Sequence, residues 1–238
     1  MQCWWLEKNG GSCPMARSPL PRDFFDRPAT EVAPALLGCV LEHETPEGLV
    51  AVELTEVEAY AGQVDPASHA YRGMTARNAV MFGPPGYAYV YFTYGMHFCV
   101  NVVCLPAGTA NAVLLRAGRV IAGEDLARRR RAARRSAPQE QASLRAIPAR
   151  ELARGPARLC QALSIDRASS GLDFCDPASP LRLRGNEGAA PTNEELTISV
   201  GPRVGVSAAA DTSWRFWIAD EPTVSAYRPH KPRSRSVS

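Results

Sequence analysis

The chain has 238 residues, of which 45% are hydrophobic, so it is long enough to bury the core of one sizeable domain. No apolar run approaches the ~20 residues that a membrane-spanning helix needs, which excludes a helical membrane protein and favours a globular one. The formal net charge is only +3, and Lys8 and Lys231 are the only lysines in an arginine-rich chain. Charge alone therefore does not identify a nucleic-acid-binding protein.

The two ends of the chain differ in composition from the rest. Residues 1–18 lack the basic start and apolar centre of a signal peptide, so we expect an unstructured extension, with Met15 favoured over Met1 as initiator. One domain is predicted over residues 19–229, followed by a basic disordered tail over residues 230–238. The predicted fold class is mixed α+β, a curved antiparallel β-sheet with peripheral helices and a protruding β-hairpin.

The first predicted helix covers residues 28–37 and packs on Phe24 and Phe25. Strands dominate from residue 39 to about residue 116, with loops over residues 61–86. The amino-terminal part of the domain is therefore expected to supply most of the sheet.

The most informative strand ends in Glu-Leu-Thr-Glu-Val-Glu-Ala-Tyr at residues 53–60. Side chains alternate between the faces of a strand, so the apolar face that includes Leu54 is expected to continue into Glu56 and Glu58. An unpaired buried carboxylate is costly, so this pattern indicates a cleft or charged partners. The alternative is that the strand leaves the core there and both glutamates are solvated.

A β-hairpin is predicted from residues 87–94 and 96–103. A Pro-Pro-Gly turn precedes this aromatic and β-branched run, and Gly95 permits a tight turn within it. The turn would return Asn101 alongside the first strand and leave Tyr94 at the tip. An exposed aromatic residue at a hairpin tip suggests insertion into a partner.

The second half of the chain is richer in loops. A helix is predicted to begin at Gly155 and Pro156, and strands are predicted near residues 181–184 and 196–200. The arginine-rich run 128–135 is the strongest positive patch. It is expected either to lie along phosphates or to form a solvated face.

Several short motifs follow one another between residues 24 and 227. They are Glu-Val-Glu-Ala-Tyr, Thr-Ala-Arg-Asn, Tyr-Val-Tyr-Phe-Thr-Tyr-Gly-Met-His-Phe-Cys-Val-Asn, Val-Leu-Leu-Arg-Ala, Gly-Pro-Ala-Arg-Leu-Cys-Gln-Ala-Leu and Arg-Val-Gly-Val. In this order and spacing, the set resembles the alkyladenine (3-methyladenine) DNA glycosylase family. The resemblance implies a base-excision-repair enzyme that flips alkylated or deaminated purines out of DNA and hydrolyses the N-glycosidic bond.

The resemblance also implies catalytic roles. Glu58 would be the general base that activates a water, and Arg116 and the Val204 backbone carbonyl would hold that water. Glu56 would be a structural neighbour. The motif has no amine nucleophile, which implies a monofunctional enzyme that leaves an abasic site.

Further roles concern DNA, and the resemblance implies them as well. The expected base-pocket residues are Tyr60, His69, Tyr91, Asn101 and Leu114, and the expected intercalating residue is Tyr94. The expected DNA-backbone contacts are Arg77, Asn78, Gly155, Arg158 and Arg203. His97 departs from the family, which commonly has tyrosine there, and this leaves the range of lesions open.

No metal and no cofactor are expected. The seven cysteines include no Cys-x-x-Cys pair, so reduced thiols and a cytoplasmic location, with association to the nucleoid through DNA, are expected. The expected partner is double-stranded DNA containing damaged purines, with no membrane association, and a monomer is expected.

Two functions other than DNA glycosylase fit parts of these patterns. One is a catalytically silent protein that binds DNA damage. The other is a carbohydrate glycoside hydrolase that uses Glu56 and Glu58, but side chains two apart on a strand lie too close together to flank a bond from opposite faces. The preferred base among 3-methyladenine, 7-methylguanine, hypoxanthine and ethenoadenine is not determined by these patterns.

Overall fold

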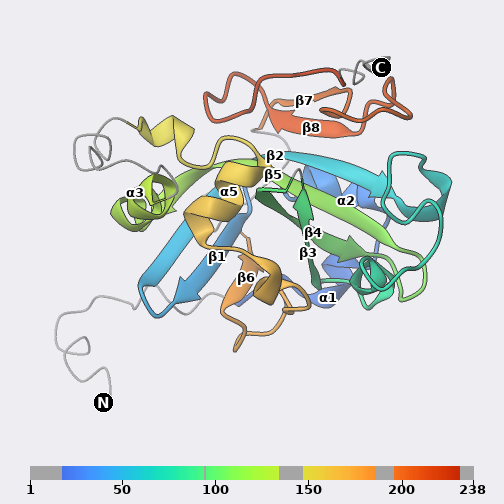
Figure 1. Ribbon diagram of the computed structural model, residues 1–238, viewed down its shortest axis with the longest axis horizontal. Helices are drawn as coiled ribbons and strands as arrows, with labels where there is room; N and C mark the ends of the chain where they lie inside the picture. The colour runs from blue at the N-terminus through green and yellow to red at the C-terminus, as the bar shows by residue number, and fades with distance from the viewer. Residues whose placement is uncertain (1–17, 94, 134–146, 186–195, 231–238) are drawn as a thin grey trace, which may run out of the picture.

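The computed structural model describes residues 18–93, 95–133, 147–185 and 196–230 (Figure 1). Its α-helices are α1 (Arg22–Phe25), α2 (Ala29–Ala35), α3 (Glu124–Ala132) and α5 (Pro156–Leu163). Its 3-10 helices are η1 (Gly62–Val64), η2 (Ala79–Phe82), η3 (Ala149–Glu151) and η4 (Arg167–Ser169). Its strands are β1 (Val40–Thr45), β2 (Gly48–Ala61), β3 (Ala88–Thr93), β4 (His97–Cys104), β5 (Asn111–Ala122), β6 (Leu181–Arg184), β7 (Ile198–Gly201) and β8 (Arg215–Ile218).

These strands form one antiparallel sheet. Its main order is β3–β4–β5–β2–β1–β6, and β8 pairs with β2 and carries β7 as a further strand. In Figure 1, β7 and β8 lie above the main sheet, while α5 crosses in front of it. The predicted α+β class and the curved antiparallel sheet are confirmed. The predicted domain boundaries stay a prediction, because most of both terminal segments lies outside the described residues.

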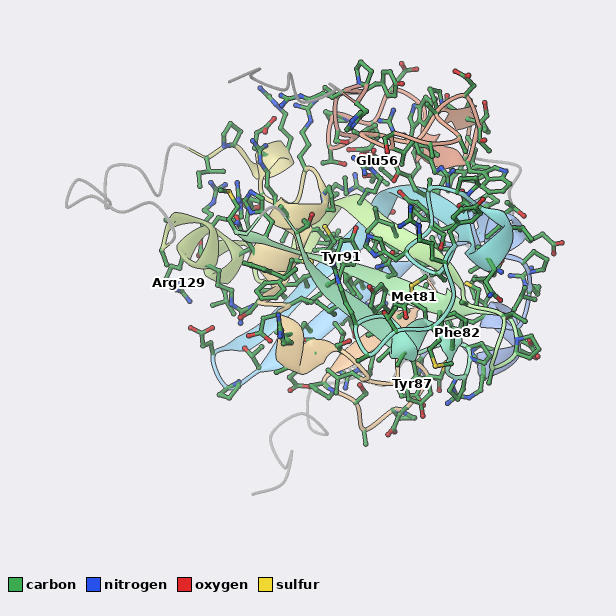
Figure 2. The ribbon with its side chains drawn as sticks, turned by 45° about the vertical axis from the view of Figure 1, so that its right-hand side comes forward. Glu56, Met81, Phe82, Tyr87, Tyr91 and Arg129 are labelled. Carbon is green, nitrogen blue, oxygen red and sulfur yellow. The ribbon has the colours of Figure 1, made fainter. Side chains whose placement is uncertain are left out.

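The two faces of the sheet bury different clusters. Alternate residues such as Val100, Val113 and Leu115 join α2 and α5 in the larger core, where each buried aliphatic side chain stabilises the fold by about 1.5–3 kcal/mol. The opposite face carries a smaller cluster that includes Met81 and Phe82 from η2. Figure 2 shows Met81 and Phe82 close together on this side of the molecule. The second face is thinly covered, which leaves room for a cavity beside the smaller cluster.

The side chains of β2 do not alternate regularly along the whole strand. The expectation that Glu56 and Glu58 lie on the same face as Leu54 is therefore wrong. Leu54 pairs with Gly118 and Glu56 with Ala117, so Thr55 is an extra residue in β2. After this bulge Val57, rather than Glu56, continues the core face that includes Leu54. An extra residue shifts every following side chain to the other face of the strand. The carboxylate of Glu58 therefore lies on the thinly covered face and does not replace core residues.

The predicted local elements agree closely with the structure. The hairpin consists of β3 and β4, and its register places Asn101 opposite Tyr89 as predicted. The predicted helices correspond to α2 and α5, and Pro156 opens α5 at its first turn. The strand predicted to end near Arg116 continues to Ala122, where Gly123 turns the chain into α3 with φ +73°. At Gly123 a Cβ would lie 2.2 Å from the Leu49 carbonyl oxygen, so only glycine fits this close approach.

Candidate active site

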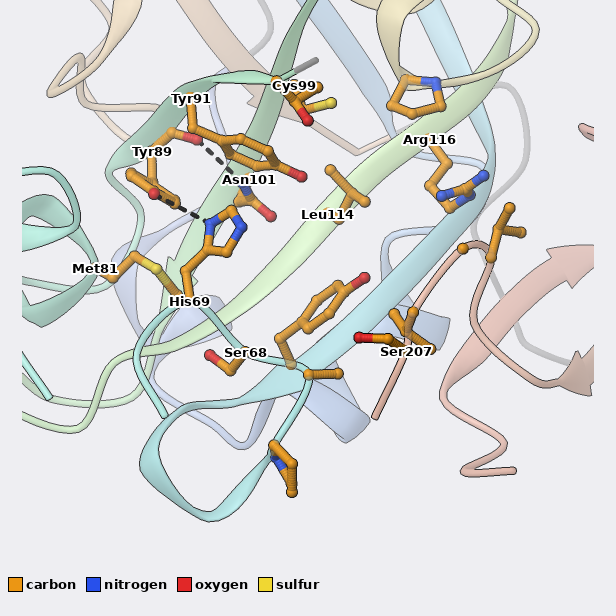
Figure 3. A pocket seen from close by; sticks show the side chains of 18 residues that line it. Ser68, His69, Met81, Tyr89, Tyr91, Cys99, Asn101, Leu114, Arg116 and Ser207 are labelled. Atoms are coloured by element: carbon orange, nitrogen blue, oxygen red, sulfur yellow. Dashed lines mark hydrogen bonds between the residues drawn. The ribbon is translucent and has the colours of Figure 1, made fainter. Parts of the chain in front are cut away.

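A cavity of about 420 Å³ opens on the thinly covered face of the sheet (Figure 3). Its lining includes these residues predicted from the sequence: Tyr60, His69, Tyr91, Asn101, Leu114, Arg116 and Val204. Figure 3 shows His69, Tyr89, Tyr91 and Asn101 on one side and Arg116 with Ser207 on the other. The volume lies within the range of about 300–1,000 Å³ that is usual for small-molecule sites.

Glu58 is fully buried, and three donors surround its carboxylate. The Val204 N–H donates to Oε1 at 2.7 Å, and the Tyr60 hydroxyl donates to Oε2 at 2.9 Å. Arg116 Nη1 lies 3.2 Å from Oε2. All three donors line the cavity, and Glu58 lies directly behind them. Charge-assisted hydrogen bonds of this kind compensate a carboxylate that has lost its water shell.

Arg116 connects Glu58 with Glu56. Its Nε donates to Glu56 Oε1 at 2.7 Å while Nη1 faces Glu58. Burial by itself would lower the pKa of Arg116, but the adjacent Glu58 and Glu56 carboxylates outweigh burial and raise it. Arg116 is therefore a permanent positive charge at the cavity wall.

Glu56 has a different environment from Glu58. Its carboxylate accepts hydrogen bonds from Arg116, from Arg215 Nε at 2.8 Å, and from the Ser225 backbone N–H at 2.7 Å. Burial by itself would raise the pKa of Glu56, but Arg116 and Arg215, together with the Ser225 N–H, lower it below its usual range. Glu56 therefore anchors Arg116 and joins β2 to the carboxy-terminal segment, in keeping with the structural role expected from the sequence.

Aromatic rings form the side of the cavity opposite Arg116. His69 meets Tyr91 edge-on with ring centroids 4.5 Å apart, and its Nδ1 lies 3.2 Å from the Tyr89 hydroxyl. Burial is the main cause that lowers the pKa of His69 and raises the pKa values of Tyr60 and Tyr91. At neutral pH all these rings are uncharged, so they offer flat faces and hydrogen-bonding edges to a ligand.

Asn101 is fixed on the floor of the cavity. It is buried, its Nδ2 donates to the Tyr89 carbonyl at 3.1 Å, and its cross-strand partner is Leu114. This bond uses one of the two N–H groups of the amide and fixes its orientation, so a ligand at this position would meet a side chain that cannot easily turn away.

Two of the residues expected at the DNA backbone are buried instead, and for these the sequence-based expectation is wrong. The Asn78 side chain donates to the His69 and Gly73 carbonyls at 2.9 and 3.1 Å, which holds the loop that presents His69. Arg203 is 1% exposed and forms an ion pair with Asp65. Neither side chain can reach a phosphate without leaving its buried partners.

The remaining residues expected at the DNA backbone lie at the surface. Arg77 is exposed, and its Nη2 donates to the Phe92 carbonyl of the hairpin at 3.3 Å. Arg158 is paired with Glu151 while 43% of its side chain stays exposed. Gly155 caps α5 with φ +103°, a conformation that favours glycine. Their role in DNA binding stays a prediction, and Tyr94 lies outside the described residues.

Within the described part of the arginine-rich run, three arginines bond to other parts of the protein. Arg128, Arg130 and Arg131 each donate to a carbonyl or side chain of another segment. Arg130, for example, donates to Thr45 at 2.6 Å and to a carbonyl of α5 at 3.3 Å. Figure 2 shows Arg129 at the outer edge of α3, away from the core. The described part of this run therefore fastens α3 to its neighbours, and the rest lies outside the described residues.

Three partners of the site could not be recognised from the sequence. Asp65, Arg215 and Ser225 each bond to a group next to the cavity, but they belong to none of the recognised motifs. The only sequence signal was the Asp65-Pro66 dipeptide, which indicates a turn without indicating an ion pair.

Metal ligands, disulfides and membrane-spanning helices can be assessed for the described residues. There, no three His, Cys, Asp or Glu side chains are arranged as metal ligands, and the cysteines are free thiols. Across the same residues, no helix is both long and apolar enough to cross a membrane.

Comparison with known proteins identifies the chain. The profile of the methylpurine-DNA glycosylase (MPG) family matches residues 23–222. The chain belongs to the methylpurine-DNA glycosylase family. It is therefore a DNA-repair enzyme that hydrolyses N-glycosyl bonds, and DNA is its substrate.

Bacterial relatives cover nearly the whole of this glycosylase. A protein of Streptomyces avermitilis is 53% identical over 221 residues, covering 92% of this chain and 96% of its own. Proteins of Leifsonia xyli and Frankia casuarinae are 51% and 49% identical and cover 88% and 89% of this chain, and 92% and 94% of their own lengths. All three are named "Putative 3-methyladenine DNA glycosylase". The family that the motifs resemble is confirmed, and the carbohydrate glycoside hydrolase and the silent damage-binding protein are disfavoured.

Proposed function

We propose that this glycosylase releases alkylated and deaminated purines from duplex DNA by flipping the nucleotide into the 420 Å³ cavity. The observation that carries the proposal is the position of Glu58. Its carboxylate lies directly behind a cavity walled by aromatic rings, and Arg116, Tyr60 and Val204 hold it from the cavity side. A purine held between Tyr60 and Tyr91 would bring its sugar toward that wall.

The proposed reaction is a hydrolysis. A water beside Glu58 and Arg116 attacks C1′ of the sugar and transfers its proton to the Glu58 carboxylate. The bond between C1′ and the purine nitrogen breaks, and its electron pair leaves with the base. 3-Methyladenine is positively charged in DNA and leaves as a neutral base, whereas hypoxanthine leaves as an anion and takes up a proton from solvent. The products are a free purine and an abasic site, and the DNA strand is not cut. Because the contact seen from Val204 to Glu58 is made by its N–H, holding the water through the Val204 carbonyl stays a prediction.

The β3–β4 hairpin is the proposed wedge. Gly95 has φ +69°, as a tight turn requires, and Phe92 and Met96 are 38% and 57% exposed beside it. Tyr94 lies between them in the chain and would fill the gap that the flipped nucleotide leaves in the stack. The enzyme is proposed to act as a monomer on the cell's DNA.

The test of this mechanism is Glu58→Gln. Its release of 3-methyladenine or hypoxanthine from a duplex in single turnover should fall by at least about 10²-fold, the effect expected for loss of a general base. Binding to the same duplex should stay close to that of the unchanged enzyme, because the hairpin and cavity remain. Release at the normal rate would show that Glu58 is not the base.

A matched control lies on the same strand. Glu53→Gln makes the same chemical change outside the cavity, where Glu53 pairs with Arg119 at the surface. This variant should release the base at the normal rate. Glu58→Asp serves as a second variant if the glutamine variant melts at a much lower temperature, since it keeps the charge but withdraws it from the cavity.

A further inference from the structure

Arg203 is among the largest side chains that the described residues bury completely. Its guanidinium bonds both oxygens of Asp65, with Nη1 2.5 Å from Oδ2 and Nη2 2.9 Å from Oδ1. Nη1 also donates to the Ala59 carbonyl at 3.1 Å. A two-point bond of this kind fixes the plane of a guanidinium, which a lysine cannot reproduce.

The plane of Arg203 lies against two aromatic rings. Its Cζ is 4.7 Å from the centre of Tyr60 and 5.1 Å from the centre of Trp214. Its Nε has no hydrogen-bond partner, and a buried unpaired donor is costly. Cation–π contacts with the two rings partly offset this cost. The guanidinium is therefore placed to support the ring of Tyr60, although its Nε stays without a hydrogen bond.

We propose that the Arg203–Asp65 ion pair positions Glu58 for catalysis. Two of the three donors to the Glu58 carboxylate depend on this pair. Arg203 supports the ring of Tyr60, whose hydroxyl donates to Oε2. Val204 is the next residue along the chain, and its N–H donates to Oε1. This inference rests on the proposed role of Glu58.

Asp65 also fixes a loop that forms another wall of the cavity. Its carboxylate also accepts hydrogen bonds from the Ala61 N–H at 3.3 Å and from the Ala67 N–H at 3.0 Å. These bonds fix the loop that leads directly to Ser68 and His69 in the cavity lining. One ion pair therefore joins the end of β2, this loop and the segment that begins at Arg203.

The third donor to Glu58 is held independently. Arg116 is anchored by Glu56, which in turn bonds Arg215 and Ser225. Loss of the Arg203–Asp65 pair should therefore misplace Glu58 without removing its charge partner, and the expected loss of rate is smaller than for Glu58→Gln.

The experiment compares Arg203→Lys and Asp65→Asn with the unchanged enzyme. Lysine keeps the charge but forms neither the two-point bond nor the flat ring contact, and asparagine keeps the shape but removes the charge. Single-turnover base release should fall by about tenfold to a hundredfold in both variants, the effect of a small misplacement of reacting groups. Binding to a duplex with an abasic-site analogue should stay within about twofold, because the hairpin that reads it is unchanged.

Arg130→Lys is the matched control. Arg130 is also largely buried, bonds Glu47, Thr45 and an α5 carbonyl, and lies outside the cavity lining. The Arg130→Lys variant should melt at a lower temperature but release the base at the normal rate. All release rates are measured well below the melting temperature of every variant. Normal rates in both Arg203→Lys and Asp65→Asn would overturn the inference, even if both variants melt early.

The two proposals fail in different ways. Normal release by Glu58→Gln would remove the proposed mechanism itself. A slow Glu58→Gln together with normal Arg203→Lys and Asp65→Asn would overturn only the positioning role. If Arg203→Lys does not fold, Asp65→Asn decides alone, because its side chain has the same shape as aspartate.

Discussion

At the scale of single residues, Glu56 and Glu58 show how partners determine the role of a side chain. Both are buried carboxylates on β2, two positions apart. Glu56 meets two arginines and a backbone N–H that consume its bonding capacity, whereas the three partners of Glu58 line the cavity. A carboxylate beside a cavity can exchange a proton with a bound water, and one enclosed by arginines serves as an anchor.

Asn101 should act as the gate against normal guanine. Its side chain is fixed by the Tyr89 carbonyl, so a 2-amino group would clash with it or leave atoms unpaired, at a cost of about 1–3 kcal/mol. Asn101→Ser and Asn101→Ala should therefore raise the release of guanine from mispairs more than they change the release of hypoxanthine. The measurement is the ratio of the two rates on one enzyme preparation.

This ratio contains its own control. A general loss of stability changes both rates in the same proportion and cancels. Thr109→Ala, a change at an exposed hydroxyl that bonds only within its own turn, should leave the ratio unaltered. A ratio that stays constant in both Asn101 variants would exclude the gate.

At the scale of elements, two irregularities in the β2–β5 pair direct the side chains that we propose to be catalytic. Thr55 is an extra residue in β2, and the register then skips Arg116 on β5. Bulges bend a strand and turn its side chains, and they are common beside active sites. Here they bring Arg116 next to both Glu56 and Glu58 while Val57 and Leu115 stay in the core.

The amino terminus of α5 is the element expected to hold a DNA phosphate. Pro156 lines the cavity, and the partly exposed Arg158 lies two residues further on, in the first turn of the same helix. Arg158→Ala should lower the magnitude of the slope of log K against log salt by about 0.9, the effect of one lost phosphate contact. The measurement is lesion-duplex binding at several salt concentrations.

Arg129→Ala provides the comparison, since it removes the same charge from the outer side of α3. Its salt slope should match that of the unchanged enzyme. A slope that changes for Arg129→Ala and not for Arg158→Ala would place the phosphate contact on α3 instead.

At the scale of the whole molecule, buried titratable groups make stability depend on pH. Burial lowers the pKa of His43 below its ordinary value of 6.5, and its Nδ1 contacts the Leu163 carbonyl at 2.7 Å. Burial likewise lowers the pKa of His69. In the unfolded chain these rings bind protons at a higher pH than in the folded protein, so protons favour unfolding.

The melting temperature should therefore be constant above about pH 7 and fall as the pH drops below about 6.5, where unfolded histidine becomes protonated. Below pH 4.5 a second loss should follow, because the pKa of Glu56 is lowered in the folded state and its contribution disappears as the carboxylate takes up a proton. Thermal unfolding between pH 8 and pH 2 measures both steps.

His43→Asn should reduce the first step, since asparagine can still donate to the Leu163 carbonyl but does not titrate. His230→Asn, a change at an exposed histidine, is the control and should leave the profile unchanged. An unaltered first step in His43→Asn would show that other groups cause it.

Much of the fold and the site could be predicted from the sequence because their signals are local. The aromatic run with a glycine turn predicted the β3–β4 hairpin and placed Asn101 beside Tyr89. Proline after glycine predicted the start of α5.

Only the tertiary structure decided which charged side chains are exposed and which are buried. Arg203 and Arg158 occur in similar motifs, yet Arg203 is enclosed by Asp65 and two rings while Arg158 lies at the surface. The bulge at Thr55 likewise moved the following side chains of β2 to the other face, and the alternation of residues in the sequence does not show where such a bulge lies. The reason is physical: the burial of a charge depends on partners distant in sequence that supply the opposite charge and exclude water, and spacing along the chain carries no record of them.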